Sequence, residues 1–87
     1  MRIWFRMISD THLINDFVYE NTEKDTRTHK VFKAVDEMCL KFDLQHPVWM
    51  DSTVRDFKRS AKARFYPDSF VEEVDFDYIE IYVIEED

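Results

Sequence analysis

Apolar and polar side chains alternate over residues 1–9, which is the pattern of a strand with one buried face. One side of this strand would carry Met1, Ile3, Phe5 and Met7, and the other Arg2, Trp4, Arg6 and Ile8. Residues 13–20 are rich in Ile, Phe, Val and Tyr, which favours a second strand. The polar link over residues 9–12 is short, so the two runs predict a β-hairpin.

Residues 26–42 change to the period of an amphipathic helix. Its apolar stripe runs through Val31, Val35, Met38 and Phe42, widened by Phe32 and Cys39. Thr26 and its neighbours Asp25 and Thr28 are candidate N-caps. Because a sheet needs a second layer to cover its apolar face, we expect this stripe to face the hairpin.

Shorter elements follow the main helix. Residues 48–50, directly after Pro47, predict a short third strand. Ser52 or Thr53 would cap a second helix that ends at Ser60.

The end of the chain predicts further strands. Residues 61–66 alternate as a strand does, although they could also prolong the second helix, and residues 76–85 alternate over a longer run. A first hairpin, one main helix and a long closing strand are the element order of β-grasp domains. The sequence therefore predicts a single α+β domain over residues 1–87, one small β-sheet packed on one main helix and β-grasp-like. The last strand would run parallel to the first at the sheet centre. The alternative is another ββα-type α+β sandwich.

Glycine is absent and cysteine occurs once, which narrows the functional classes. Phosphate-binding loops of the P-loop and dinucleotide types need glycine, so we expect no cofactor. Cys39 has no internal disulfide partner, which favours a reducing compartment and predicts a cytoplasmic protein. No apolar run approaches the roughly 20 residues that span a bilayer, and no signal-peptide segment is visible, so no membrane association is predicted.

Charge is distributed in blocks along the chain. The net charge is −7, yet residues 52–67 hold five Lys or Arg against one acidic residue, and residues 68–87 hold nine acidic residues and no basic one. The basic block consists of Arg55, Lys58, Arg59, Lys62 and Arg64. On one helix, the first four would fall at i, i+3, i+4 and i+7 and form a basic stripe. The simplest interpretation is that the two blocks are solvated faces that pair with each other.

Trp4 is one of two candidates for partner binding, ranked after the basic stripe. It lies between Arg2 and Arg6 on the outer side of the predicted first strand. Trp and Arg are the residues that dominate interface hot spots, so this face could anchor a partner. Tyr78 and Tyr82 would extend it if the first and last strands are neighbours.

The basic stripe is the stronger candidate. Its cations could hold phosphates while a neighbouring aromatic ring stacks on a base, as in single-strand binders. However, the sequence pI is near 4.8, whereas nucleic-acid-binding domains are usually basic. The acidic residues 72–87 offer a related alternative, because spaced carboxylates can imitate a phosphate backbone, as in DNA-mimic inhibitors.

No enzymatic signature is present. Cys39 and His46 are close in sequence, but a free cysteine on the apolar flank of a helix is typically a buried hydrophobe. The three histidines at positions 12, 29 and 46 lack the spacing of zinc ligands. The sequence predicts a non-enzymatic protein-interaction module without metal, which contacts an unknown protein partner or forms a homodimer. A nucleic-acid-related role is the alternative.

Several stretches resemble a group of short, uncharacterised bacterial proteins of similar length. The matching segments are residues 25–32 (DTRTHKVF), 42–44, 47–51 (PVWMD), 57–59, 64–65 and 75–80 (DFDYIE). The resemblance spans most of the chain and implies a bacterial, cytoplasmic protein. It implies no activity and supplies no catalytic residue.

Overall fold

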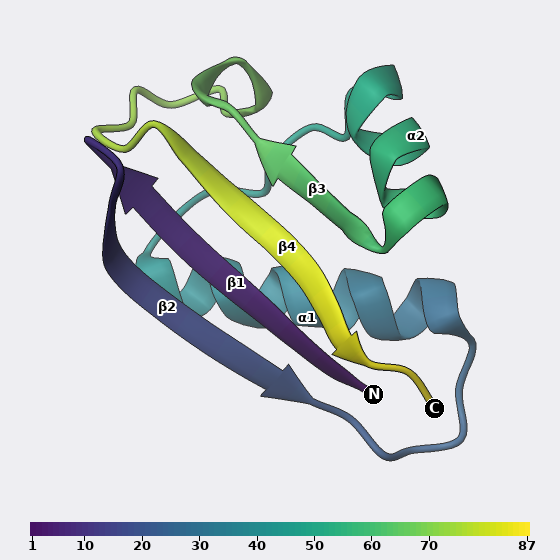
Figure 1. The fold of residues 1–87 in the computed structure, drawn as a ribbon. Helices are drawn as coiled ribbons and strands as arrows, with labels where there is room; N and C mark the ends of the chain where they lie inside the picture. Colours follow the sequence, from purple (N-terminus) through teal and green to yellow (C-terminus); the bar gives the residue numbers. More distant parts are fainter.

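The computed structural model describes residues Met1 to Asp87 as one four-stranded sheet with two helices (Figure 1). The elements are β1 (Arg2–Ser9), β2 (His12–Glu20), α1 (Arg27–Phe42), α2 (Asp51–Ser60), β3 (Lys62–Phe65), a 3-10 turn (Pro67–Ser69) and β4 (Tyr78–Glu85). The strand order is β2-β1-β4-β3, and every neighbouring pair is antiparallel. The predicted α+β class, with one sheet packed on a main helix, is confirmed.

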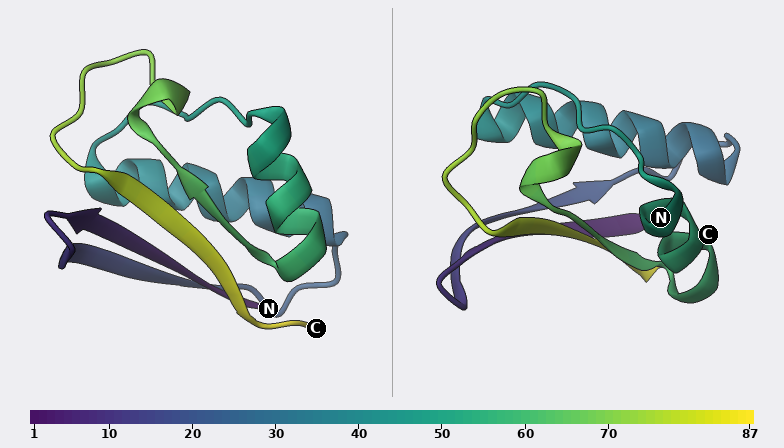
Figure 2. Two further views of the ribbon diagram at one scale, coloured as in Figure 1. Left: turned by 45° about the horizontal axis from the view of Figure 1, so that its top comes forward. Right: turned by 90° about the horizontal axis from the view of Figure 1, so that it is seen from above.

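The two faces of the sheet differ. α1 lies across one face, whereas α2 lies beside the edge strand β3 (Figure 2). No helix or loop crosses the other face, which is seen from the front in Figure 1 and which we call the open face. Side chains that point away from α1 therefore lie on the open face, where a binding partner can reach them.

The predicted direction of the last strand is wrong. β4 does lie beside β1 at the centre of the sheet, but the two strands are antiparallel. The reason is α2, which carries the chain back along the sheet before β3 begins (Figure 1). β3 then runs in the direction of β1, and β4 must return the opposite way. The parallel central pair of a β-grasp domain is absent, and the α+β sandwich alternative describes the fold better.

Two local predictions around α2 are also wrong. Residues 48–50 form no strand; the only ladder-like bond there joins the Val48 N–H to the Ser69 carbonyl at 2.7 Å. α2 begins at Asp51 after Met50, one to two residues before the predicted caps, and no side chain caps it. The carboxylate of Asp51 lies in the first turn instead, where it suits the helix dipole.

Residues 61–66 are mainly strand, which settles the choice left open by the sequence. Ala61 adopts a left-handed conformation and ends α2. Lys62 then enters β3, where Ala63 and Phe65 point into the core and pair with β4. Burial of these side chains and the ladder hydrogen bonds outweigh one more turn of helix.

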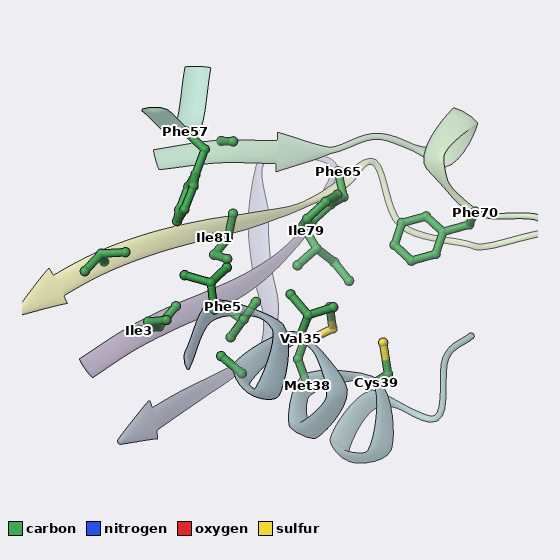
Figure 3. Packing of buried hydrophobic residues seen from close by; sticks show 14 of the residues in the cluster. Ile3, Phe5, Val35, Met38, Cys39, Phe57, Phe65, Phe70, Ile79 and Ile81 are labelled. Atoms are coloured by element: carbon green, nitrogen blue, oxygen red, sulfur yellow. The ribbon is translucent and has the colours of Figure 1, made fainter. Parts of the chain in front are cut away.

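The core lies between the sheet and α1 (Figure 3). Phe5 and Ile81 from the two central strands point toward Val35 and Met38 of α1. The predicted stripe of α1 is buried at Val31, Val35, Met38 and Cys39, but Phe42 is only half-buried. The prediction that Phe32 is buried is wrong, since its exposed fraction is 51%. Ala34 and Lys30 are buried instead. Thr26 is confirmed as the N-cap, and its hydroxyl accepts the His29 N–H at 3.1 Å.

Tight turns in this chain are made without glycine. The β1–β2 turn places Asp10 at φ 50° and Thr11 at φ 64°. Positive φ suits the two-residue hairpin turn, but it is unfavourable for a β-branched residue. The turn therefore stores backbone strain at Thr11.

Replacing Thr11 by Gly is expected to stabilise the protein, because glycine adopts positive φ without a Cβ clash. After the extra chain entropy of glycine in the unfolded state, we expect a gain of about 0.5–1 kcal/mol. That corresponds to a rise in melting temperature of roughly 3–6 °C, measured by circular dichroism. Thr11→Ala, which keeps the Cβ, serves as the control and should give a much smaller rise. Equal rises in the two variants would contradict the strain assignment.

Candidate functional site on the open face of the sheet

The open face is organised in cross-strand rows. Trp4 of β1 lies between Val18 of β2 and Tyr82 of β4, and Lys62 of β3 lies on the far side of Tyr82. The Trp4 indole Nε1 donates to the Asp16 carboxylate at 2.9 Å. The predicted outward position of Trp4 is therefore confirmed, and its ring is fixed by a neighbour in β2.

The next row is made of charged residues. Asp16, Arg6, Glu80 and Arg64 follow one another across the four strands. Glu80 accepts hydrogen bonds from the Arg6 guanidinium and, at 3.4 Å, from Arg64 Nε. Its side chain is only 3% exposed although no element covers this face, because the two arginines lie over it.

Cations and aromatic rings alternate on this face. The cation–ring pairs are Arg6 over Trp4 at 4.8 Å, Arg64 over Tyr78 at 4.3 Å and Lys62 over Tyr82 at 4.8 Å, measured to the ring centroids. Such contacts hold long flexible side chains against the sheet and contribute about 0.5–1 kcal/mol each at exposed sites. The result is an ordered surface of Arg, Trp and Tyr.

The charge of Glu80 is set by competing effects. Burial by itself would raise its pKa, but the hydrogen bonds and positive charges of Arg6 and Arg64 outweigh burial, so the pKa lies below its usual value. Glu80 is therefore ionised at neutral pH and neutralises part of the charge of the two arginines. Arg2, at the beginning of β1, has its Nε 3.6 Å from the Glu20 carboxylate and its Nη1 3.9 Å from the Glu85 carboxylate.

The predicted basic stripe is divided between two elements. Arg55, Lys58 and Arg59 lie exposed on α2, but α2 ends at Ser60, so Lys62 and Arg64 belong to β3. The prediction of one helical stripe with Lys62 is wrong, because the turn at Ala61 redirects the chain. Lys62 and Arg64 instead join Arg2, Trp4 and Arg6 on the open face.

A polar groove joins the two groups of cations. It lies between α2 and β3, has a volume of about 360 Å³ and includes Arg59, Lys62 and Arg64 in its lining. Ser52 and Ser60 add hydroxyl groups, and Asp56 and Glu80 add carboxylates. The open face therefore continues into this groove at its β3 edge.

The acidic C-terminal residues pair mostly with the beginning of the chain. Asp87 binds Lys30 Nζ at 2.7 Å, and Glu86 binds Arg27 at 3.2 Å. Of the basic block, only Arg64 pairs with this segment, through Glu80. The interpretation that the acidic and basic blocks pair with each other is therefore correct for one residue only. The partners of the acidic end are the cations of β1 and α1.

His46 and Cys39 have separate hydrogen-bond partners. Burial, together with nearby Asp36 and Glu72, raises the pKa of the Cys39 thiol to about 11. His46 Nε2 lies 2.5 Å from Asp36, while Cys39 Sγ points to the Gln45 carbonyl at 3.7 Å. No group of three or more His, Cys, Asp or Glu side chains is placed to hold a metal ion. A Cys39–His46 thiolate pair has no geometric support.

Sequence reasoning missed Glu80 and the groove beside it. Glu80 stands between Ile79 and Ile81, so period-2 alternation does place it opposite the core. Its pairing with Arg6 and Arg64 depends on the antiparallel register of three strands, and a parallel β4 would have given other neighbours.

No protein-family model, curated protein or solved structure matches the chain. No helix has the length and apolar character needed to cross a bilayer. The resemblance to short bacterial proteins therefore stays a hypothesis, and the functional argument rests on the open face.

Proposed function

We propose that this protein is a non-enzymatic protein-interaction module that binds its partner through the open face of the sheet. The observation that carries the proposal is the array of Trp4, Tyr78 and Tyr82 interleaved with arginine and lysine on a face that no element of the chain covers. Trp, Tyr and Arg are the residues enriched at interface hot spots. Their intramolecular contacts reduce the conformational entropy that binding would otherwise cost.

The charge balance of the open face favours a protein over a nucleic acid. Its four cations face four carboxylates, namely Arg2, Arg6, Lys62 and Arg64 against Asp16, Glu20, Glu80 and Glu85. A phosphate backbone would have to displace the carboxylates that pair with Arg2, Arg6 and Arg64, in a protein of net charge −7.

The proposal is tested by affinity capture from a bacterial lysate with the tagged protein, followed by washes at low and high salt. We expect a protein partner that survives the high-salt wash and is lost with Trp4→Ala, because an alanine at a hot-spot tryptophan costs about 2 kcal/mol or more, or roughly 30-fold in affinity. Sedimentation of the purified protein distinguishes another protein from a second copy of this chain.

Leu40→Ala is the matched control, since Leu40 is a large exposed apolar residue on the outer side of α1. It should leave capture unchanged. Circular dichroism must show that both variants are folded. Retention of the same partner by Trp4→Ala would refute the assignment of the open face.

A nucleic-acid-related role is the second candidate. It is favoured by Arg55 and Lys58, which are exposed on α2 and make no ion pair. Nucleic acid released steeply by salt in the same capture experiment, and lost with Arg59→Glu combined with Lys58→Glu, would place it first. DNA mimicry has less support, because Glu80, Glu86 and Asp87 are paired with cations of the chain itself. A bacterial, cytoplasmic setting is part of the leading proposal.

A further inference from the structure

A second surface lies on the helical side of the molecule, away from the open face. An apolar groove of about 310 Å³ runs between α1 and α2. Its lining comprises Arg27, Thr28, Val31 and Phe32 of α1, Trp49 of the connecting segment, and Val54, Phe57 and Lys58 of α2. This volume is at the low end of the range for ligand pockets, so the groove has room for a few apolar side chains.

The base of the groove is part of the packed core, whereas its rim is exposed to solvent. Val31 and Phe57 are buried and belong to the hydrophobic core. Trp49 packs edge-on against Phe57 and Phe65, with ring centroids 5.6 and 4.9 Å apart. Phe32, in contrast, is half-exposed on the rim. An exposed phenylalanine beside an apolar groove loses its contact with water only when something docks there.

Cations flank the groove on both helices. Arg27 lies over the Phe57 ring at 5.1 Å and is held by Glu86. Lys58, on the opposite wall, makes no ion pair within the chain. The lining contains no carboxylate. Because Glu86 pairs with Arg27, the uncompensated charge at the groove is the positive charge of Lys58, in a protein whose net charge is −7.

We propose that the groove between α1 and α2 binds an acidic amphipathic segment of a partner protein, whose apolar side chains fill the groove while its carboxylates meet Lys58 and Arg27. Helical segments that present apolar anchors at i, i+3, i+4 and i+7 commonly occupy grooves between two helices. This groove is separate from the open face, so the test of this proposal is independent of the test of the proposed function.

The two tryptophans allow the groove to be observed alone. Trp4 lies on the open face and Trp49 lines the groove, so Trp4→Phe leaves Trp49 as the sole tryptophan. The probe is an acetylated, Trp-free helical peptide of about 16 residues, or roughly four turns. It carries Leu at i, i+3, i+4 and i+7, Glu at four other positions and Ala at the remaining ones, which keeps it helical at neutral pH. We expect a saturable change in Trp49 fluorescence with this peptide. A matched peptide with Lys in place of Glu should bind at least about fivefold more weakly, because its charges repel Lys58 and Arg27.

Two variants connect the signal to the groove. Phe32→Ala should weaken binding about fivefold or more by removing the exposed apolar wall, and Lys58→Glu should weaken it by a similar factor. Leu40→Ala, on the same helix but outside the groove, should change nothing. The proposal is overturned if no saturable change occurs up to about 1 mM peptide, if the Lys peptide binds as well as the Glu peptide, or if Phe32→Ala binds normally. Dimerisation that buries Trp49 without peptide would also overturn it, since a second copy would then be the occupant.

Discussion

Replacing Met38 by Asp is expected to leave the chain unfolded at neutral pH and 25 °C. Met38 has no exposed surface and points from the middle of α1 toward the central strands (Figure 3). Truncation of a buried methionine alone costs about 2–5 kcal/mol. An unpaired carboxylate at the same position adds several kcal/mol of desolvation. A domain of this size has a total stability on the order of 5–10 kcal/mol, so the combined cost removes the folded state.

Two substitutions on the same helix isolate the cause. Met38→Leu keeps volume and polarity close to the original and should cost less than about 1.5 kcal/mol. Leu40→Asp introduces the same carboxylate two residues away, at a residue that is 78% exposed in the last turn of α1, and should cost only about 1 kcal/mol through lower helix propensity and the helix dipole. Urea unfolding followed by circular dichroism measures all three variants. A cooperative transition of normal midpoint in Met38→Asp would mean that α1 does not cover the sheet through this residue.

The hairpin and α1 could be predicted because local pattern and tertiary environment agree. β1 has one buried face, β2 places Phe17 and Tyr19 half-buried on the same side of the sheet, and α1 has both a capping threonine and a continuous apolar stripe. The sequence misplaced Phe32 because periodicity reports which residues share a face, not how wide a stripe the neighbouring layer can cover. The sheet reaches Ala34 and Lys30 on one flank of α1, and α2 leaves Phe32 uncovered on the other.

The direction of β4 could not be predicted from local pattern. Buried and exposed residues alternate in the same way in a parallel and in an antiparallel strand. The direction of β4 therefore depends only on how many times the chain runs along the sheet before it. Residues 48–50 do not pair in the sheet, and of the three only Trp49 packs on the core, against Phe57 and Phe65. The expectation of a parallel β4 rested on the β-grasp order of elements, which the antiparallel pairing of β1 with β4 contradicts.

The site was predictable in part for the same reason. Trp4, Arg2 and Arg6 follow from alternation within β1 alone, and the structure places them as expected. Bringing Lys62 and Arg64 to this face required the break at Ala61, where a non-glycine residue adopts φ 55°. No sequence pattern marks such a position, because left-handed alanine is maintained by the tertiary contacts around it.

Combining Arg6→Met with Arg64→Met is expected to destabilise the protein by about 3 kcal/mol at pH 7. Either arginine alone can still pair with Glu80, so each single variant should cost much less than half of this. The double variant leaves a nearly buried carboxylate without its cations. We place the effect at the lower end for lost buried pairs because both arginines are partly exposed, at 32% and 46%. The expected fall in melting temperature is roughly 10–25 °C.

Removing the two arginines should reverse the way in which Glu80 makes the stability depend on pH. In the native protein the pKa of Glu80 is lowered, so its ion pairs stabilise the fold above the unfolded-state pKa of about 4.3, and this contribution is lost as the pH falls through the folded pKa. In the double variant, burial of the carboxyl group is opposed only by the more distant charge of Lys62, so its pKa should rise and protonation should favour folding. The difference in unfolding free energy between the two proteins should therefore be largest near pH 7 and shrink toward pH 4.

Adding Glu80→Leu to the double variant removes the charge altogether and should restore most of the stability at pH 7, because an apolar replacement of an ion-pair cluster is often neutral. A double variant that is as stable as the native protein at pH 7 would show that the arginines hold no buried charge, and a triple variant that gains nothing would show that they stabilise the sheet by packing alone.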